Sequence, residues 1–442
     1  MLLVHTPRLT NRLGYTLNVT FKTLLHIPYL ITDDSEYFAK YEGPKMAYGT
    51  TPIGDAPFLR AASLLFETSV SRFDIKCITH LDTKALFPVD HPSLLPYDPL
   101  AAIFFMLSRY EEYLPFQPDQ HGRFPASQSV AYQHQFLHTA VVDRWALQLH
   151  KALLLHFPDL PSPSRHAEFP ITIDVDAAYC YRHKGLIRTL RGFTLDLLLR
   201  RSRANFMHRL RVLLNKENDP YDNFDYILAQ TRQHLSTPAV FFILLGDYSN
   251  FDKPIAFTNR SFRQLIQYLG DNAKMAIHPS YYALEQPELI AKETQRLSNI
   301  LHRTIVRSRF HFLRFSLPNS YQNLIDNNIL HDYSMGYPND IGYRAGTGTP
   351  YPFFDLSTNQ EQQLTIHPFI AMDTTLNTHM HLSSDEAEQY LNQLIHENIL
   401  NQGTLSTLWH NQNLSDSDQW AGWRSIFEHL LLSAEQAKNT SF

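Results

Sequence analysis

The sequence has only two cysteines, Cys77 and Cys180, among its 442 residues. They lie far apart in unrelated local contexts, so a disulfide framework is excluded and a reducing compartment is favoured. The first residues show no apolar core preceded by basic residues, so no signal peptide is predicted. Together these absences lead us to expect a cytoplasmic location.

Long hydrophobic runs are also missing, since no apolar stretch approaches the roughly 20 residues that a transmembrane helix needs. Glycine is scarce, at 15 residues against 26 prolines, so Pro, Asn and Asp must shape most loops. The net charge of −5 gives no argument for nucleic-acid binding, and we expect none. What remains is a globular balance of 44% apolar and 18% charged residues, in a chain long enough for two or three domains.

Residues 1–160 are expected to form a smaller α/β domain of unknown role. Alternating apolar and polar residues predict strands, and an aspartate N-cap followed by proline predicts the start of a helix. The expected elements are strands at 15–25 and 27–32, a helix that begins at Asp98-Pro99, and a second helix at about 142–156.

Two features near the end of this part need interpretation. The charged cluster Arg109–Tyr113 could bind a ligand, but a solvated helix end with internal ion pairs is the favoured interpretation. The segment 158–170 contains four prolines among polar residues, which is typical of a linker. We therefore expect a second domain at 166–442.

After residue 216, strands and helices are predicted to alternate, which is typical of a parallel α/β sheet, open or closed. In such folds functional residues collect at the carboxyl ends of the strands. The predicted strands are 239–244, 274–278, 310–315 and 364–367, and the predicted helices are 222–234, 261–269, 285–301, 320–328 and 384–400.

A basic segment at 182–216 interrupts this pattern. It holds ten Lys and Arg against one acid, with Leu and Phe interleaved at helical spacing, which predicts a basic amphipathic helical pair. One interpretation is a surface for anionic lipid, nucleotide or an acidic glycan, which would give peripheral contact with a membrane or an acidic partner. The favoured alternative is an insertion packed on the fold with its basic side in water.

The strand predicted at 171–176 carries Asp174 and Asp176. Side chains alternate along a strand, so both carboxylates point to one face, where they repel each other and lose hydration. A cation, a proton or a substrate group between them would relieve this, whereas a solvated strand end with two capping aspartates is the equally supported alternative. Further polar groups lie at predicted strand ends, namely Asp247, His278, Arg314 and His410.

The order of these motifs resembles the NodB-type polysaccharide deacetylases (carbohydrate esterase family 4). The chain resembles in particular a divergent bacterial branch with an uncharacterised N-terminal domain, to which 109–116 and 121–124 would belong. The segments 332–337 and 342–347 resemble that branch as well. The resemblance implies a distorted (β/α) barrel of the polysaccharide-deacetylase type over 166–442, with one divalent metal ion, zinc being expected.

The resemblance also implies residue roles. Asp174 would be the general base and Asp176 a metal ligand, Arg314 would orient the base, and His410 would be the general acid. Asp332 matches a later catalytic aspartate. The residues expected to contact substrate are Tyr281, Tyr282, Tyr343 and Arg344.

The metal site departs from the family pattern. His278 is kept as a ligand, but Tyr282 stands where a second histidine belongs, and zinc sites need about three protein ligands. The third ligand could be His311, His367 or the other aspartate of the pair. His311 and Arg314 are three positions apart, so on a regular strand they would face opposite ways.

The expected function is a metal-dependent hydrolase that removes N-acetyl or O-acetyl groups from an amino-sugar glycan or its precursor. Two alternatives stay open. One is a metal-poor C–N hydrolase of small amides, which the absence of a second histidine favours. The other is a catalytically degenerate barrel that serves as a glycan- or membrane-associated binding subunit.

Overall fold

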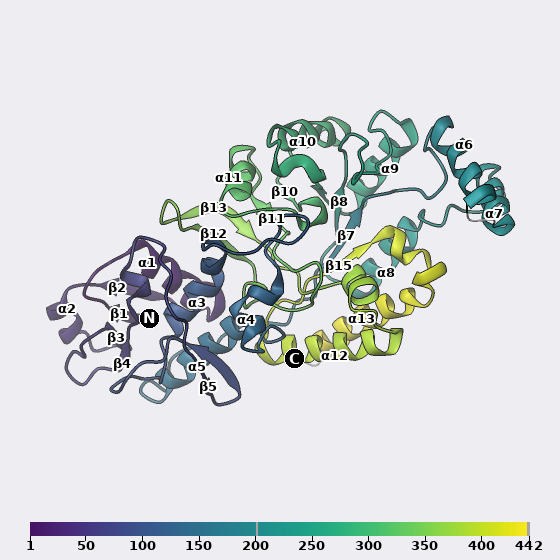
Figure 1. The fold of residues 1–442 in the computed structure, drawn as a ribbon. Helices are drawn as coiled ribbons and strands as arrows, with labels where there is room; N and C mark the ends of the chain where they lie inside the picture. The colour runs from purple at the N-terminus through teal and green to yellow at the C-terminus, as the bar shows by residue number, and fades with distance from the viewer. Residues whose placement is uncertain (200–201, 440–442) are drawn as a thin grey trace.

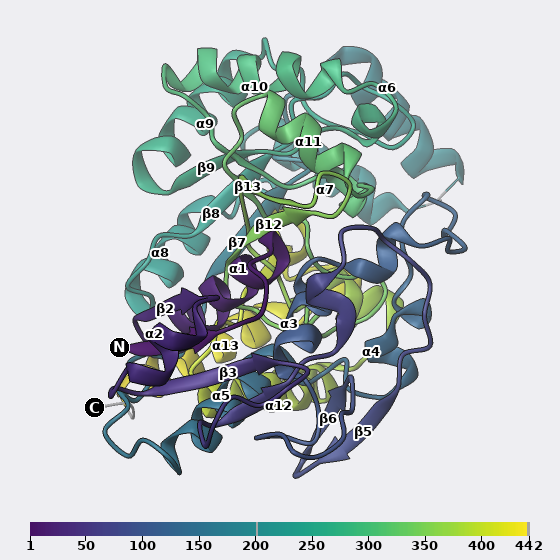
Figure 2. The same cartoon turned by 90° about the vertical axis from the view of Figure 1, so that its left-hand side faces the viewer.

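The computed structural model describes residues 1–199 and 202–439 and is mixed α/β, as expected. Figures 1 and 2 show the chain from two directions. Arg200 and Arg201, two of the cations counted in the basic segment, lie outside the described residues. Within the described residues, no helix is both long and apolar enough to cross a membrane.

A four-stranded parallel sheet lies in the first 60 residues, in the order β2-β1-β3-β4. Strand β1 is buried throughout because Leu2, Leu3 and Val4 are all apolar. The strands are β1 (Leu2–His5), β2 (Tyr29–Thr32), β3 (Lys45–Gly49) and β4 (Phe58–Arg60). The strand predicted at 27–32 is thus confirmed as β2.

The strand predicted at 15–25 is wrong, because this segment forms α1 (Asn11–Leu17) and the π-helix η1 (Asn18–Leu24). Its buried leucines and phenylalanine recur every three to four positions, a helical spacing that outweighs the local alternation. Thr10 caps α1 by accepting a hydrogen bond from the N–H of Leu13 at 3.1 Å.

The two predicted helices of this part are confirmed as α3 (Pro99–Leu107) and α5 (Val141–Leu154). Asp98 is the N-cap of α3, since one of its carboxylate oxygens accepts the N–H groups of Leu100 and Ala101 at 3.0 Å. The other elements here are α2 (Ser35–Lys40), η2 (Ser63–Phe66), β5 (Cys77–His80), β6 (Thr83–Leu86), η3 (Tyr110–Tyr113), η4 (Ala126–Gln128) and α4 (Val130–Gln133).

A nine-stranded sheet organises the rest of the chain, in the order β12-β13-β11-β10-β9-β8-β7-β15-β14. Its pairs are parallel except for the antiparallel β12–β13 hairpin at one edge. The strands are β7 (Ile171–Val175), β8 (Val240–Ile243), β9 (Lys274–Ile277), β10 (Arg307–Ser308), β11 (His331–Asp332), β12 (Tyr351–Asp355), β13 (Gln360–Ile366), β14 (Ala371–Met372) and β15 (Thr407–His410).

A closed barrel is not confirmed by this sheet. Among the described strands, no hydrogen-bonded pair joins the edge strands β12 and β14. Strands β10, β11 and β14 have only two residues each, and the hairpin turns one edge antiparallel. The sheet nevertheless brings the carboxyl ends of its parallel strands to one side, as parallel order requires.

The helices predicted between the strands are present, and so is the cap of the longest one. Ser383 and Glu386 form a capping box at the start of α12. The helices are α8 (Phe224–His234), α9 (Arg260–Asn272), α10 (Glu288–Leu301), α11 (Asn319–Asp326), α12 (Ser384–Asn401) and α13 (Trp423–Asn439), with short turns η6 (Tyr281–Leu284), η7 (His311–Leu313), η8 (Thr375–His379), η9 (Asn411–Ser415) and η10 (Asp418–Trp420).

The basic segment forms a helical excursion between β7 and α8. It contains α6 (Leu186–Thr194), the π-helix η5 (Leu195–Leu199) and α7 (Arg203–Leu213). Figure 1 shows α6 and α7 at the end of the molecule opposite the small sheet. The predicted helical pair is therefore confirmed for the described residues.

The two parts of the chain pack against each other. Helices α1 and α3 contact the β12–β13 hairpin, and the rings of Phe104 and Phe354 are 5.1 Å apart. Because one buried apolar cluster runs through both parts, the division into 1–160 and 166–442 remains a proposal.

Residues 109–112 are buried rather than solvated, which corrects that part of the favoured interpretation, whereas the internal ion pairs that it expected are present. Glu112 accepts hydrogen bonds from Nε and Nη2 of Arg344 at 2.9 and 2.7 Å, and both side chains are buried. The guanidinium of Arg109 also pairs with Glu111 and Glu112, at 2.7 and 2.8 Å. The partner that covers this cluster comes from more than 200 positions away, which local sequence cannot reveal.

Candidate metal and catalytic site

Asp174 and Asp176 lie at the carboxyl end of β7, which pairs with β8 and β15 in the large sheet. In the register of the strands, Asp174 is opposite His410 of β15 on one side and Phe242 of β8 on the other. Asp174 is buried, and Asp176 retains partial access to solvent. The strand ends therefore bring these carboxylates and His410 together, as the sequence predicts.

Asp176, His278 and His311 form a cluster in which one ligand atom of each residue lies within 4.8 Å of the others. Nε2 of His278 is 3.3 Å from Oδ1 of Asp176, and Nε2 of His311 is 3.6 Å from Oδ2. A tetrahedral ion with bonds of about 2.0–2.1 Å spaces its ligand atoms by roughly 3.3 Å. The cluster therefore has the dimensions of a mononuclear site.

Two atoms of this cluster have unmet bonding capacity. Oδ1 of Asp176 and Nε2 of His278 are both buried, and neither has a hydrogen-bond partner in the part of the chain that the structure describes. Leaving two buried polar atoms unpaired is costly unless something binds them. Two imidazole nitrogens and a carboxylate suit Zn²⁺ and similar divalent ions, with a fourth position left for water or substrate. The residues present therefore fit a catalytic metal.

Both histidines are held in orientations that point Nε2 at Asp176. Nδ1 of His311 lies 2.7 Å from Oδ1 of Asp252, and Nδ1 of His278 contacts the backbone carbonyl of Arg309. Such partners on the far nitrogen direct the near nitrogen to a metal. Asp252 was not among the predicted residues, since it lies in a loop after β8 rather than at a strand end.

Charges in the cluster reinforce one another. Burial raises the pKa of Asp176, but the charge of His311 and the nearby imidazoles of His278 and His410 outweigh burial, so this pKa lies well below its usual range. Burial lowers the pKa of His311, yet Asp176 and Asp252 raise it to about 9. Without a metal, a proton on His311 supplies the positive charge that the carboxylates favour.

Asp174 is paired with a buried arginine beside the cluster. Nη1 of Arg309 donates to Oδ1 of Asp174 at 2.7 Å. The same guanidinium donates to Oγ1 of Thr172 at 2.9 Å and to the carbonyl of Tyr333 at 2.9 Å. The other oxygen of Asp174 is 3.6 Å from Nε2 of His278, so the paired carboxylate borders the metal cluster.

Arg314 does not fill the role expected of it, because Arg309 makes the contact with Asp174. Arg314 pairs with Glu285 and donates to the carbonyls of His121 and Tyr281 at 2.8 and 3.0 Å. The physical reason is local: the predicted strand at 310–315 is the turn η7, where Phe312 and Leu313 have φ of 59° and 53°. These left-handed residues turn His311 into the site and carry Arg314 away from it.

His410 borders the cluster from the other side. Its Nδ1 lies 2.8 Å from Oδ1 of Asp373 and its Nε2 lies 3.7 Å from Oδ2 of Asp176. Burial lowers the pKa of His410, but Asp373, Asp176 and Asp174 outweigh burial and raise it to about 10. Asp373 was missed from the sequence, although an aspartate directly after the apolar segment 368–372 is a strand-end signal of the kind seen at Asp174.

The other predicted residues lie elsewhere. Asp332 is buried on β11, where it accepts two hydrogen bonds from Ser334, and burial raises its pKa to about 6. Tyr343 is buried, as is Arg344 against Glu112. His367 lies 3.0 Å from His331, so of the three ligand candidates it is His311 that joins the cluster.

The two tyrosines predicted to contact substrate belong to the turn η6. Tyr281 is buried and stacks on Phe251 with ring centroids 3.9 Å apart, and its hydroxyl is 3.0 Å from Nδ1 of His121. Tyr282 is only partly buried and its ring lies edge-on to Tyr281. These contacts are packing around the site rather than an open sugar platform.

A cavity of about 200 Å³ opens over the catalytic groups. The N-terminal part of the chain contributes Arg123, which donates to Asp119 at 2.8 Å and to the carbonyl of Phe312 at 2.7 Å. The lining residues are Arg123, Asp174, Asp176, His278, Phe310, His311, Phe312, Leu313, Pro338, Met372, Thr374, His379, Leu408, His410 and Gln412. Both parts of the chain therefore shape this pocket.

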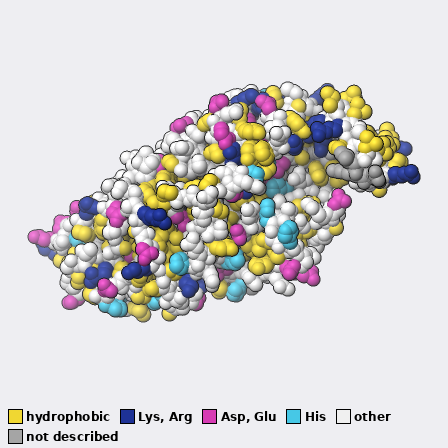
Figure 3. All heavy atoms as spheres, in the orientation of Figure 1, with side chains coloured by type: hydrophobic (Ala, Val, Ile, Leu, Met, Phe, Trp, Pro, Cys, Tyr) yellow, Lys and Arg dark blue, Asp and Glu magenta, His cyan; other side chains and the backbone are white. Residues whose placement is uncertain are grey.

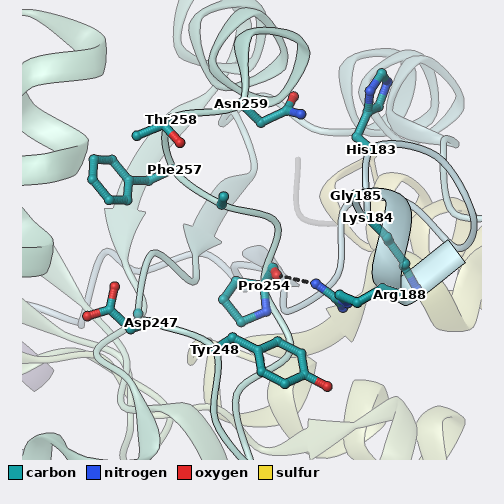
Figure 4. A pocket seen from close by; sticks show the side chains of 12 residues that line it. His183, Lys184, Gly185, Arg188, Asp247, Tyr248, Pro254, Phe257, Thr258 and Asn259 are labelled. Atoms are coloured by element: carbon teal, nitrogen blue, oxygen red, sulfur yellow. Dashed lines mark hydrogen bonds between the residues drawn. The ribbon is translucent and has the colours of Figure 1, made fainter. Parts of the chain in front are cut away.

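A second pocket, of about 630 Å³, lies between α6 and the loop that joins β8 to α9. Figure 4 shows Arg188 and Tyr248 on one side of it and Phe257 and Asn259 on the other. It shares no lining residue with the catalytic cavity.

Comparison with known proteins gives a family match for the N-terminal part alone. Residues 2–158 match a family described as a family of unknown function, DUF7033. No curated protein matches the chain.

Several solved structures are similar over part of the chain. A protein described as a polysaccharide deacetylase from Mycobacterium smegmatis has a TM-score of 0.38 and 13% identity, covering 64% of this chain and 94% of its own. A polysaccharide deacetylase from Bacillus cereus has a TM-score of 0.31 and 10% identity, covering 61% and 88%. A peptidoglycan N-acetylglucosamine deacetylase has a TM-score of 0.31 and 13% identity, and the match covers 63% of this chain and 85% of its own. These likenesses are weak, and the function proposed below rests on side-chain geometry.

Proposed function

We propose that this protein is a metal-dependent hydrolase that removes acetyl groups from the N-acetylated amino sugars of a glycan or glycan precursor. One observation carries the proposal. The Asp176–His278–His311 cluster lies between a carboxylate paired with Arg309 and an imidazole paired with Asp373. A metal site flanked by a base on one side and an acid on the other is the arrangement that amide hydrolysis requires.

The chemistry follows from the groups on each side. A divalent ion held by Asp176, His278 and His311 would make a bound water more acidic and polarise the acetyl carbonyl. Asp174 would accept a proton from the water as its oxygen bonds to the carbonyl carbon. His410, as imidazolium, would donate a proton to the sugar nitrogen as the C–N bond breaks. The products are acetate and a free amino sugar, and an O-acetyl ester would give acetate and an alcohol by the same steps.

The pairing partners would keep each group in its working state. Arg309 holds the charge of Asp174 paired in a buried site, where an isolated carboxylate would be costly. Asp373 accepts from Nδ1 of His410, which leaves Nε2 to face the cavity. Both partners are therefore positioning residues for the proposed base and acid.

The alternative of a metal-poor hydrolase loses its main support. In the sequence, Tyr282 favours that alternative because it replaces a histidine. In the structure, His311 reaches the cluster from the turn after β10 and supplies a second imidazole. The proposed base Asp174 and the proposed acid His410 also border the cluster, which supports a hydrolase over a catalytically degenerate barrel.

The test is acetate release from N-acetylglucosamine oligomers by the purified chain. We expect turnover in the presence of Zn²⁺ or Co²⁺, loss of turnover after chelation, and recovery when metal is restored. Asp174→Asn should abolish turnover without releasing the metal, because Asp174 lies outside the ligand cluster. Turnover that survives complete chelation would contradict the proposal, as would full activity of Asp174→Asn.

We also propose a cytoplasmic location, which the two free cysteines support.

The N-terminal part is proposed to complete the substrate pocket through Arg123. No role beyond that is assigned to it.

A further inference from the structure

The helical excursion turns its apolar side chains toward solvent. Leu186, Ile187 and Leu190 of α6 are 79%, 83% and 59% exposed, and Leu198 of η5 is 70% exposed. Residues three to four positions apart share a helix face, so Leu186 and Leu190 form one stripe with Ile187 beside it. Figure 3 shows hydrophobic and basic side chains gathered at this end of the molecule.

The inner side of the excursion combines an ion pair with an aromatic contact, since the rings of Phe193 on α6 and Phe206 on α7 are 4.9 Å apart. Nε of Arg209 on α7 donates to Oδ2 of Asp196 at 2.8 Å, and both side chains are buried. The guanidinium lies 4.5 Å from the ring centroid of Tyr181. It comes so close to α6 that a Cβ on Gly192 would be 2.5 Å from its Nη1. An ion pair, an aromatic contact and the close approach at Gly192, rather than the exposed leucines, therefore hold α6 and α7 together.

A second polar contact fixes α6 on the body of the protein. Nη1 of Arg188 donates to the carbonyl of Pro254 at 2.9 Å, which Figure 4 shows as a dashed line. The same guanidinium lies 4.7 Å from the ring centroid of Tyr248. Arg188 is two positions from Leu186 and from Leu190, so it leaves the helix on the side away from the leucine stripe. The excursion is thus anchored by its polar side, with the stripe facing outward.

This arrangement is the reverse of an ordinary surface helix, which turns its apolar stripe to the core. A contiguous exposed apolar patch marks an interaction surface. The leucines are not needed to hold the excursion in place, because Arg188, Asp196, Gly192 and Arg209 do that. A partner that covers the stripe is the remaining physical reason for its composition.

The charge of the excursion indicates what kind of partner this is. Residues 182–216 carry ten Lys and Arg against one acid, a net charge of +9. The whole chain has 38 basic and 43 acidic residues, so the rest has 28 against 42, a net charge of −14. Among the described cations, Arg191, Arg203, Arg211 and Lys216 are exposed. Positive charge is therefore concentrated around the apolar stripe.

We propose that the exposed face of α6 and η5 docks on an anionic lipid bilayer. Leucine and isoleucine side chains would enter the boundary between headgroups and acyl chains, while the flanking cations contact anionic headgroups. The excursion lies at one end of the molecule (Figure 1), so a planar surface can reach it without meeting the N-terminal part. A symmetric dimer through this face is disfavoured, because it would place two segments of charge +9 against each other.

Vesicle sedimentation of the full chain tests this proposal. We expect binding to vesicles of phosphatidylcholine mixed with phosphatidylglycerol, little binding to phosphatidylcholine alone, and weakening as salt rises. The triple variant Leu186→Ser/Ile187→Ser/Leu190→Ser should lower affinity roughly tenfold or more, since burial of these side chains is lost. Its thermal transition should match that of the wild type, because the three side chains are exposed.

Leu155→Ser is the matched control, since Leu155 is 85% exposed but lies at the end of α5. It should bind vesicles as the wild type does. A charge variant, Arg191→Gln/Arg203→Gln, should weaken binding to anionic vesicles at low salt. Equal binding to neutral and anionic vesicles would overturn the proposal, as would unchanged binding by the triple variant. Self-association seen by light scattering and abolished by the triple variant, without vesicle binding, would assign the face to a second copy of the chain instead.

Discussion

Nδ1 of His410 lies 2.8 Å from Oδ1 of Asp373, and the backbone N–H of His410 donates to the other oxygen of the same carboxylate at 2.7 Å. Burial alone would lower the pKa of this imidazole, but Asp373 and the nearby aspartates raise it from 6.5 to about 10. These carboxylates therefore favour the protonated imidazole at neutral pH, which is the state that the proposed role of His410 as general acid requires.

The pH dependence of the reaction follows from this pair. Because the pKa of His410 is raised in the folded protein, its protonation stabilises the fold. This contribution to the free energy of unfolding is fully present below about pH 6.5 and is lost as the pH rises through about 10. Asp373→Asn should move the basic limb of the profile of kcat/KM against pH to lower pH. A basic limb that stays in place in this variant would show that Asp373 does not set the protonation of the acid.

Two arginines near the site should differ in their importance for stability. Arg309 is fully buried against Asp174, so Arg309→Met would leave a buried carboxylate without its cation, at a cost of about 3–5 kcal/mol. Arg314 pairs with the half-exposed Glu285 and donates to two backbone carbonyls, so Arg314→Met should cost less, about 1–2 kcal/mol. Urea unfolding monitored by circular dichroism measures both. Equal losses in the two variants would contradict the assignment of Arg309 as the partner of Asp174.

The buried ion pair between Glu112 and Arg344 should couple the two parts of the chain. Glu112→Ala leaves the buried guanidinium of Arg344 without this carboxylate, and we expect a loss of about 3–5 kcal/mol. Glu36→Ala is the control, because Glu36 and Lys40 form an exposed pair, and it should have no measurable effect. Both parts should unfold in a single thermal transition in the wild type. Two separate transitions in the wild type would contradict this coupling.

Much of the large sheet could be predicted from the sequence, because its strands and helices are locally encoded. The apolar strand 239–244 and the capped helix beginning after Ser383 are examples, since burial and capping depend on neighbouring residues. The segment 15–25 shows the opposite case. Its alternation favours a strand, but packing of α1 against α3 and the β12–β13 hairpin favours a helix. The leucines and phenylalanine of this segment also recur at helical spacing, so the sequence supports both structures and tertiary packing decides between them.

The candidate site was predictable where residues lie at the carboxyl end of a strand or directly after it. Asp174, Asp176, His278 and His410 fall in this class, and the structure brings them together. The third ligand could not be chosen, because His311 reaches the site only through the left-handed turn at Phe312 and Leu313. The same turn directs Arg314 away from the site, so Arg309 instead of Arg314 pairs with Asp174. Asp252 lies in a long loop, where sequence spacing says nothing about position.

The metal content of the purified protein tests the central claim most directly. Wild type expressed with zinc and analysed by plasma mass spectrometry should hold one divalent ion per chain. His311→Ala should lose it, because two protein ligands do not hold zinc tightly. His379→Ala is the matched control, since His379 lines the same cavity but lies outside the ligand cluster. A full complement of metal in folded His311→Ala, or its absence from folded wild type grown with zinc, would contradict the account.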